Sequence, residues 1–497
     1  MDLALLVKVC LFIASAATFA ASYFSGTVNN VMNMMTGKES SFRKFQITYL
    51  AVYLTGMIAD WLQGPFVYAL YDSYGYSRSE NASLFVAGFG ASAIFGTFVG
   101  SWADKFGRRK FAFLYCVLYI ISCMTKHVKS FNMLMLGRLT GGVATSLLFS
   151  VFDSWMVSEH NHRGFDADLL GGTFSVAMFG NSLVAILAGE IGEFAAGIKS
   201  LTDTGALGIH FGGFCAPFDV SILFLFICIG AMSVLWSENY GKESGKFEDG
   251  NALIENMSSG VQVIVKKPLV LFVGASCALF ESSMFIFVFN WTPAVMEEGA
   301  PKPPFGHIFA CFMVMSMLGS QLFMLLTQTR PIEQVGRWTF VLAAVALFVP
   351  VIIADVNTRF LSFLVFEMCV GMYFPMMGTL KGVVVPEESR STIYNLYRVP
   401  LNVVVTLVLL LNVDMQAAFI CTSFMMGAAV VCQTQVIKLN PFFAEDDADA
   451  EVGEGVGNTA AVESELAALK SNQEDEQSLG PPAVEMGVSA MSKVEAF

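Results

Sequence analysis

Charged residues are scarce in this 497-residue sequence. They make up 14% of the chain against 55% hydrophobic residues, and the mean hydropathy is +0.61. Soluble domains average about 25% charged residues, which supply much of the surface that faces water. The composition therefore excludes a chain that folds entirely in water.

Metal-binding and catalytic signatures are also missing. The five histidines do not cluster at ligand spacing, and the ten cysteines are scattered without a C-x-x-C pair. No H-E-x-x-H, phosphate-binding loop or dinucleotide fingerprint occurs. We therefore expect neither an enzyme nor an ATP-driven pump, and no cofactor, metal or nucleic-acid partner. The cysteines are expected to be buried free thiols.

The sequence instead contains apolar runs of roughly 20 residues, the length that crosses ~30 Å of hydrocarbon as a helix. Thirteen such runs occur, at 3–24, 47–72, 83–103, 110–126, 131–157, 167–189, 213–236, 269–292, 305–328, 338–356, 360–380, 393–412 and 415–437. Backbone groups in lipid must be hydrogen-bonded within the protein, so these runs predict a helical bundle. The predicted fold is an all-α polytopic membrane protein whose necessary partner is the lipid bilayer.

The first run resembles a signal peptide in position but not in pattern. It lacks a basic leading region, carries Lys8 within the run and has no clear cleavage site. We expect it to be retained as an additional N-terminal helix.

Basic residues are divided unevenly between the two sets of loops that alternate along the chain. One set holds seventeen, including Lys381 and the cluster at 105–110, and the other holds six, including Lys126. Cytoplasmic loops of membrane proteins carry the excess of lysine and arginine. This bias places the loop 105–110 and the C-terminus in the cytoplasm and the N-terminus outside.

The net charge of −13 is concentrated in the last segment. Residues 441–497 contain thirteen acidic and two basic residues, which gives −11 and leaves −2 for the rest. An acidic segment poor in aromatics cannot bury enough apolar surface to fold. We expect 439–497 to be a disordered cytoplasmic tail, which either repels neighbouring molecules or recruits a cytoplasmic partner.

A weak internal repeat relates the two parts of the chain. The segment 104–108 (DKFGR) matches 333–337 (EQVGR) at an offset of 229, which also aligns Arg138 with Glu367. Two parallel halves around a central site are typical of transporters. The predicted organisation is listed in chain order: 1–44, additional helix and loop; 45–236, first six-helix half; 237–268, cytoplasmic linker; 269–438, second six-helix half; 439–497, tail.

Two segments resemble signatures of the major facilitator superfamily. Segment 100–109 (GSWADKFGRR) is similar to its loop between helices 2 and 3, and 134–144 (LMLGRLTGGVA) to its helix 4 signature. Further segments resemble the molybdate-anion transporter family: 59–65 (ADWLQGP), 147–155 (LLFSVFDSW), 236–240 (WSENY), 279–282 (LFES), 286–293 (IFVFNWTP), 371–375 (GMYFP) and 397–400 (YRVP). The resemblance covers about residues 45–438. It implies the major facilitator fold and uptake of molybdate across a cellular membrane, expected to be the plasma membrane.

The resemblance also assigns a latch to the basic loop. It implies that Asp104 caps a neighbouring helix end or pairs with an arginine, for which Arg108 and Arg109 are at hand. Glu333 and Arg337 are expected to form a weaker latch in the second half. The alternative is that these cations only set the topology.

Basic side chains within the membrane are costly and therefore mark candidate sites. Arg138 and Arg398 lie inside apolar runs, and Asn395, Arg398 and Asn402 share one helix face. Two converging arginines would match a tetrahedral dianion, because a guanidinium offers a planar fork of donors. We expect these residues and Gln63 to contact substrate, although a structural or coupling role for Arg138 stays open.

Acidic side chains within the runs offer a second function. Asp60, Glu281 and Glu367 are expected either to carry a proton that drives anion entry or to neutralise an arginine. Asp153, nearer the cytoplasmic end, is expected to belong to the gate.

Two other functions stay open from sequence. One is the transport of another small anion, such as sulfate or an organic anion. The other is a non-transporting receptor that acts through its acidic tail.

Overall fold

The chain folds into a bundle of long helices that correspond to all thirteen apolar runs. This computed structural model describes residues 2–27, 31, 40–166, 168–205, 208–241, 250–297, 299–386 and 390–439. The predicted acidic tail at 439–497 lies almost entirely outside the described residues. By length and composition, ten described helices can cross a membrane, or eleven when the bent α5 counts as one span.

The first half contains seven helices, two short 3-10 turns and a small hairpin. Their bounds are α3 (Ser40–Trp61), η1 (Gly64–Phe66), α4 (Val67–Ser73), α5 (Arg78–Phe106), α6 (Arg108–Thr125), α7 (Phe131–His162), α8 (Asp168–Ile198), β1 (Thr202–Asp203), β2 (His210–Phe211), η2 (Gly213–Cys215) and α9 (Ala216–Leu235). The second apolar run is thus interrupted, because Pro65 lacks the N–H that a continuous helix requires.

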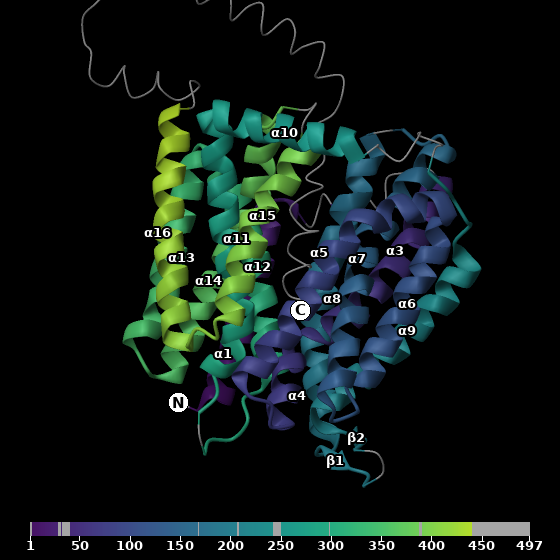
Figure 1. Cartoon of the computed structure of the whole chain (residues 1–497), viewed down its shortest axis with the longest axis vertical. Coiled ribbons are helices and arrows are strands. Elements are labelled where there is room, and N and C mark those ends of the chain that lie inside the picture. The colour runs from purple at the N-terminus through teal and green to yellow at the C-terminus, as the bar shows by residue number, and fades with distance from the viewer. Residues whose placement is uncertain are drawn as a thin grey trace, which may run out of the picture.

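The second half contains six helices and is preceded by a further one. These are α10 (Gly250–Lys266), then α11 (Pro268–Ala294), α12 (Phe305–Leu326), α13 (Ile332–Ile352), α14 (Val356–Val384), α15 (Arg390–Leu410) and α16 (Met415–Leu439). The two halves stand side by side, with α10 across one end and the β1–β2 hairpin at the other (Figure 1). We name these the linker end and the hairpin end of the bundle.

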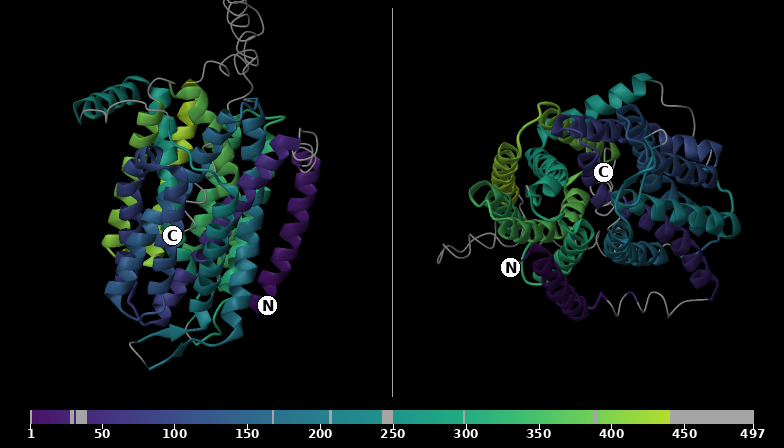
Figure 2. Two further views of the ribbon diagram at one scale, coloured as in Figure 1. Left: turned by 90° about the vertical axis from the view of Figure 1, so that its right-hand side faces the viewer. Right: turned by 90° about the horizontal axis from the view of Figure 1, so that it is seen from below.

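The additional helix α1 (Leu3–Phe24) lies at the edge of the bundle (Figure 2). It packs on α12 of the second half, where the Thr18 hydroxyl donates to the Val314 carbonyl at 3.2 Å. Its opposite face exposes Phe12 and Phe19, which are 78% and 70% accessible. Apolar side chains this exposed fit a lipid environment and not water.

Candidate functional site

Asp60 lies deep inside the first half, just before the break in the first span. Its side chain is completely buried, and Oδ1 accepts a short hydrogen bond from the Tyr119 hydroxyl of α6. Tyr119 in turn lies 3.2 Å from the Thr145 hydroxyl of α7. Asp60 Oδ2 has no hydrogen-bond donor among the described residues. This carboxyl is therefore held by one neutral hydroxyl group, that of Tyr119.

Gln63 faces the interior of the first half. Its Nε2 donates to the Ala59 carbonyl at 3.1 Å and to the Ser221 hydroxyl of α9 at 3.3 Å. Gln63 and Asp60 thus belong to the packing of the first half.

Glu281 centres a polar cluster in the second half. Its Oε1 accepts hydrogen bonds from the Tyr373 hydroxyl at 2.9 Å and the Cys277 thiol at 3.2 Å. The Lys381 ammonium lies 3.9 Å from the same thiol and 5.2 Å from the Tyr394 ring centroid. Lys381 is close enough to Glu281 for their charges to attract.

Arg398 adds a second cation to this cluster. Its charge acts on that of Lys381, and it is exposed together with Asn395 and Asn402 on α15. The three residues expected to share a face therefore do so, beside a lysine that the sequence assigned to a loop. We define the cationic cluster as Lys381 and Arg398 with the adjacent Glu281.

Arg138 and Arg398 do not converge in this conformation, unlike the expected pair. Arg138 lies in the first half, about 10 Å from the hairpin end of α7, whereas Arg398 lies in the second half, about 12 Å from the linker end of α15. The reason is that α7 enters the bundle from the hairpin end and α15 from the linker end. Arg138 donates to the Leu84 carbonyl at 3.1 Å and stacks over Phe85 at 4.4 Å.

A small cavity of 20 Å³ lies between the halves, and Glu367 lines it. Its other walls are mainly aromatic, and they include Tyr68 and Phe85 from the first half and Trp291 and Phe309 from the second. The volume suits about one water molecule. Because Phe85 contacts both Arg138 and this cavity, it connects the buried arginine to the boundary between the halves.

Contacts near the hairpin end join the two halves. The Arg78 guanidinium of α5 donates to Asn290 Oδ1 at 2.6 Å and to the Val413 carbonyl at 3.0 Å. On the α8–α12 side, His307 Nδ1 lies 2.9 Å from Glu190 Oε1, and the Gly306 N–H donates to Glu193 at 2.7 Å.

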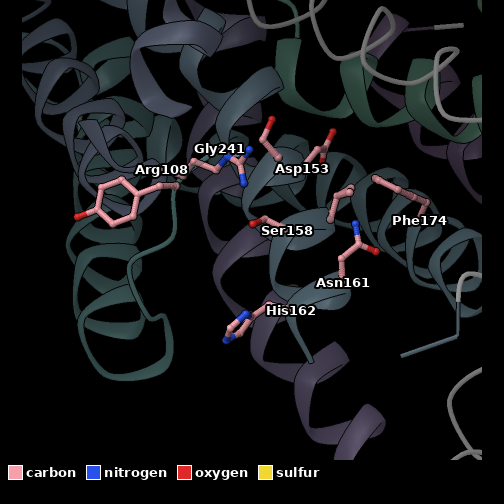
Figure 3. A pocket seen from close by; sticks show the side chains of 10 residues that line it. Arg108, Asp153, Ser158, Asn161, His162, Phe174 and Gly241 are labelled. Atoms are coloured by element: carbon pink, nitrogen blue, oxygen red, sulfur yellow. The ribbon is translucent and has the colours of Figure 1, made fainter. Parts of the chain in front are cut away.

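A larger cavity of 790 Å³ lies at the linker end of the first half (Figure 3). Asp153, Ser158 and Asn161 line it from α7, Phe174 from α8, and Arg108 from α6. The Asp153 carboxylate accepts a hydrogen bond from the Tyr49 hydroxyl at 2.8 Å. Asp153 is thus half-buried and lines a cavity at the linker end, and its assignment to the gate stays a prediction.

The basic loop is fixed to the segment that follows α9. Arg108 Nε pairs with Asp104 Oδ1 at 2.7 Å, so the expected acid–arginine pair forms. The helix cap comes from a different residue: Glu238 accepts from the backbone N–H groups of Arg109 and Lys110 at 2.8 and 3.2 Å. The Arg109 side chain donates to the Ser233 carbonyl at 2.9 Å.

The corresponding loop of the second half has different contacts. Gln433 Nε2 donates to the Glu333 carbonyl at 3.3 Å, and the Arg337 guanidinium lies 5.7 Å from the centroid of the Trp338 ring. Glu333 is buried, at 6% exposure.

Four residues with notable contacts were not predicted from the sequence: Lys381, Lys126, Arg78 and Glu238. Both lysines were counted as loop cations, yet Lys381 lies in the last turn of α14 and Lys126 is 1% exposed. A signal was present for Glu238, which lies in the quoted segment 236–240. Within the described residues no group of histidine, cysteine and acidic side chains is arranged to hold a metal ion.

Comparison with known proteins identifies the family. A family described as sugar transporters with 12 TM matches residues 7–371. The chain is 32% identical to the molybdate-anion transporter of Takifugu rubripes over 408 residues, which cover 76% of this chain and 82% of that protein. It is 33% identical to that of Xenopus laevis over 384 residues, with 75% and 80% covered. The chain belongs to the molybdate-anion transporter family of the major facilitator superfamily.

Solved structures agree with the fold of this family. A D-xylose–proton symporter superposes with a TM-score of 0.59 at 14% identity, over 82% of this chain and 99% of that one. The inward-open xylose transporter of E. coli gives a TM-score of 0.58 at 13% identity, over 80% and 96%. The predicted family and the major facilitator fold are confirmed, and a family of transporters agrees with the expectation that the chain is not an enzyme.

Proposed function

We propose that this protein carries molybdate into the cell across the plasma membrane by alternating access. The observation that carries the proposal is the family membership, with relatives named molybdate-anion transporters matched over about 80% of their length. The basic loops lie at the linker end, so this end faces the cytoplasm. The N-terminus and the hairpin end then face outward.

The cationic cluster is the proposed anion contact on the cytoplasmic side. Lys381 lies near the carboxylate of Glu281, and the charge of Arg398 acts on Lys381, so the two cations leave a positive surplus that attracts a dianion. Arg398 is exposed with Asn395 and Asn402, which supply amide donors beside the guanidinium fork. In this role Glu281 pairs with Lys381 and keeps the cluster from binding substrate too tightly for release.

Asp60 is the proposed proton carrier. It is fully buried, its hydrogen bond comes from a tyrosine, and binding a proton removes the cost of a buried charge. Glu367, at the cavity between the halves, is the second candidate for this role. A proton bound there compensates part of the charge of the entering anion.

The test is molybdenum accumulation in cells that lack their own molybdate uptake. The cells express the wild-type chain, Arg398→Ala, Lys381→Met or the control Arg330→Ala, which removes an exposed arginine outside the cluster at the same end. We expect uptake at nanomolar molybdate, with excess sulfate present, from the wild type and the control, and at least a tenfold loss in the two cluster variants. No uptake by wild-type protein at the cell surface would overturn the proposal.

A further inference from the structure

Lys126 is a buried lysine whose ammonium lacks a hydrogen-bond acceptor. It follows the last residue of α6 at the hairpin end and is 1% exposed. Within the described part of the chain, its Nζ makes no hydrogen bond. An ammonium buried without an acceptor is costly, so the side chain either loses its proton or is stabilised by a bound anion.

Two further donor groups lie on neighbouring helices. The Lys126 Nζ lies 5.7 Å from the centroid of the Tyr71 ring, and the fully buried Tyr71 hydroxyl is likewise without a partner among the described residues. On the other side, a Cβ placed on Gly137 of α7 would lie 3.0 Å from Nζ. The guanidinium of the next residue, Arg138, points towards α5, where it lies 3.3 Å from the position of a Cβ on Gly88. The Arg138 charge acts on both Lys126 and Tyr71.

These groups share one chemical property, since an ammonium, a guanidinium and a tyrosine hydroxyl can all donate to an anion. Charge-assisted hydrogen bonds of this kind are about twice as strong as neutral ones. We propose that Lys126, Arg138 and Tyr71 bind a small inorganic anion near the hairpin end. Chloride and a tetrahedral oxyanion such as molybdate share the required chemistry.

This site goes beyond the proposed transport route. All three residues belong to the first half, on α4, at the end of α6 and on α7, whereas the cationic cluster belongs to the second half. A bound anion would therefore remain with the first half while the halves move. It would neutralise part of the positive charge of Arg138, which lies over the Phe85 ring at the boundary between the halves.

The test is anion-dependent thermal unfolding of the purified full-length protein in detergent. Tryptophan fluorescence reports unfolding while sodium gluconate is replaced at constant ionic strength by chloride, and separately while molybdate is added. The variants are Lys126→Met, Lys126→Arg, Arg398→Ala and the control Lys129→Met, which removes an exposed lysine three residues away.

We expect chloride to raise the unfolding temperature of the wild type in a saturable manner. Lys126→Met should weaken this anion affinity by about 10- to 100-fold, as expected for the loss of one charge-assisted hydrogen bond. In gluconate, Lys126→Met should be at least as stable as the wild type, because it removes an uncompensated charge. Lys126→Arg and Lys129→Met should retain the response.

The remaining outcomes identify the anion or refute the site. Stabilisation by molybdate alone, lost in Lys126→Met, would assign an oxyanion to the same site. Arg398→Ala should keep the stabilisation while losing uptake, so this inference and the proposed function fail separately. A wild type unaffected by both anions, or a Lys126→Met variant with the full response, would overturn the inference.

Discussion

Gly107 shows how one residue fixes the basic loop. It ends α5 with φ of 115°, a conformation that side chains other than glycine rarely adopt, and a Cβ there would lie 2.7 Å from the Glu238 carboxyl carbon. The same carboxylate caps α6 through two backbone N–H groups. The glycine thus permits the cap that holds α5, α6 and the segment after α9 together.

Gly107→Ala should therefore destabilise the protein. The backbone conformation alone costs about 1–3 kcal/mol, and the displaced Glu238 weakens the cap in addition. Thermal unfolding in detergent measures the loss. Gly100→Ala is the matched control, because a Cβ at Gly100 meets nothing within 4 Å. Equal stability of the two variants would contradict this account of the loop.

His127 makes stability depend on pH at the hairpin end. Burial lowers the pKa of its ring, but hydrogen bonds with Asp219, Cys215 and the His210 carbonyl outweigh burial and raise the pKa to about 10. Its Nε2 lies 3.0 Å from Asp219 Oδ1. A raised pKa means that the folded state binds the proton more tightly, so the stabilisation is complete below about pH 6.5 and disappears as pH rises through about 10.

His127→Gln should lower stability at pH 7 by about 1 kcal/mol, a modest value because Asp219 is 46% exposed and water weakens the pair. The wild-type and variant unfolding curves should converge above pH 10. His162→Gln, at an exposed position, serves as the control. A difference that grows with pH would refute the assignment of the pair.

At the scale of elements, α8 of the first half and α12 of the second approach each other closely. A Cβ on Gly306 would lie 2.3 Å from the Gly189 carbonyl oxygen, and one on Gly189 would lie 2.6 Å from the Gly306 carbonyl oxygen. Backbone atoms cannot move aside as a flexible side chain can. The two glycines therefore allow the hairpin end to close.

Gly306→Val should shift the protein towards a state in which the hairpin end is open. The readout is labelling of Thr292→Cys, 1% exposed in the closed arrangement, by a membrane-impermeant maleimide added outside cells. We expect at least tenfold faster labelling together with reduced uptake. Gly197→Ala on α8 is the control, since its added Cβ meets nothing within 4 Å. Unchanged labelling would mean that α8 and α12 do not limit closure.

Apolar run length predicted the helices well, because the bilayer imposes that length on every span. It could not predict which polar residues face one another. Lys126 and Lys381 were counted by sequence position as loop cations, yet neighbouring helices bury the first and place the second in a cluster with Arg398. Likewise, a cap supplied by Glu238 from 129 residues away leaves no local pattern beside Arg109.

The helix α10 was not predicted from the sequence, for a different reason. The linker 237–268 was treated as polar chain, although Ile254, Met257, Val261 and Ile264 recur at spacings of three and four. Such a pattern is typical of a helix with one apolar face. In the structure α10 packs on α11 and α15, which places it beside the second half at the linker end.

At the scale of the whole molecule, closure near the hairpin end defines one state of the proposed transport cycle. Arg78, the α8–α12 contact and the aromatic walls of the 20 Å³ cavity join the halves there, while Arg398 and its neighbours on α15 are exposed. In the proposed orientation, which places the linker end in the cytoplasm, this is the state that would release substrate inward. Alternating access then requires the hairpin-end contacts to break.

Deletion of the acidic tail distinguishes the transporter function from the receptor function. The cationic cluster, Asp60 and the contacts that close the hairpin end all lie between residues 40 and 439, so deletion of 441–497 should leave molybdate uptake within about twofold of wild type per molecule at the cell surface. Such a deletion removes eleven net negative charges and no residue of the proposed route. A receptor that signals through its tail would instead become silent. Uptake that vanishes although the truncated protein reaches the surface would show that the tail takes part in transport, and the proposed route would have to include it.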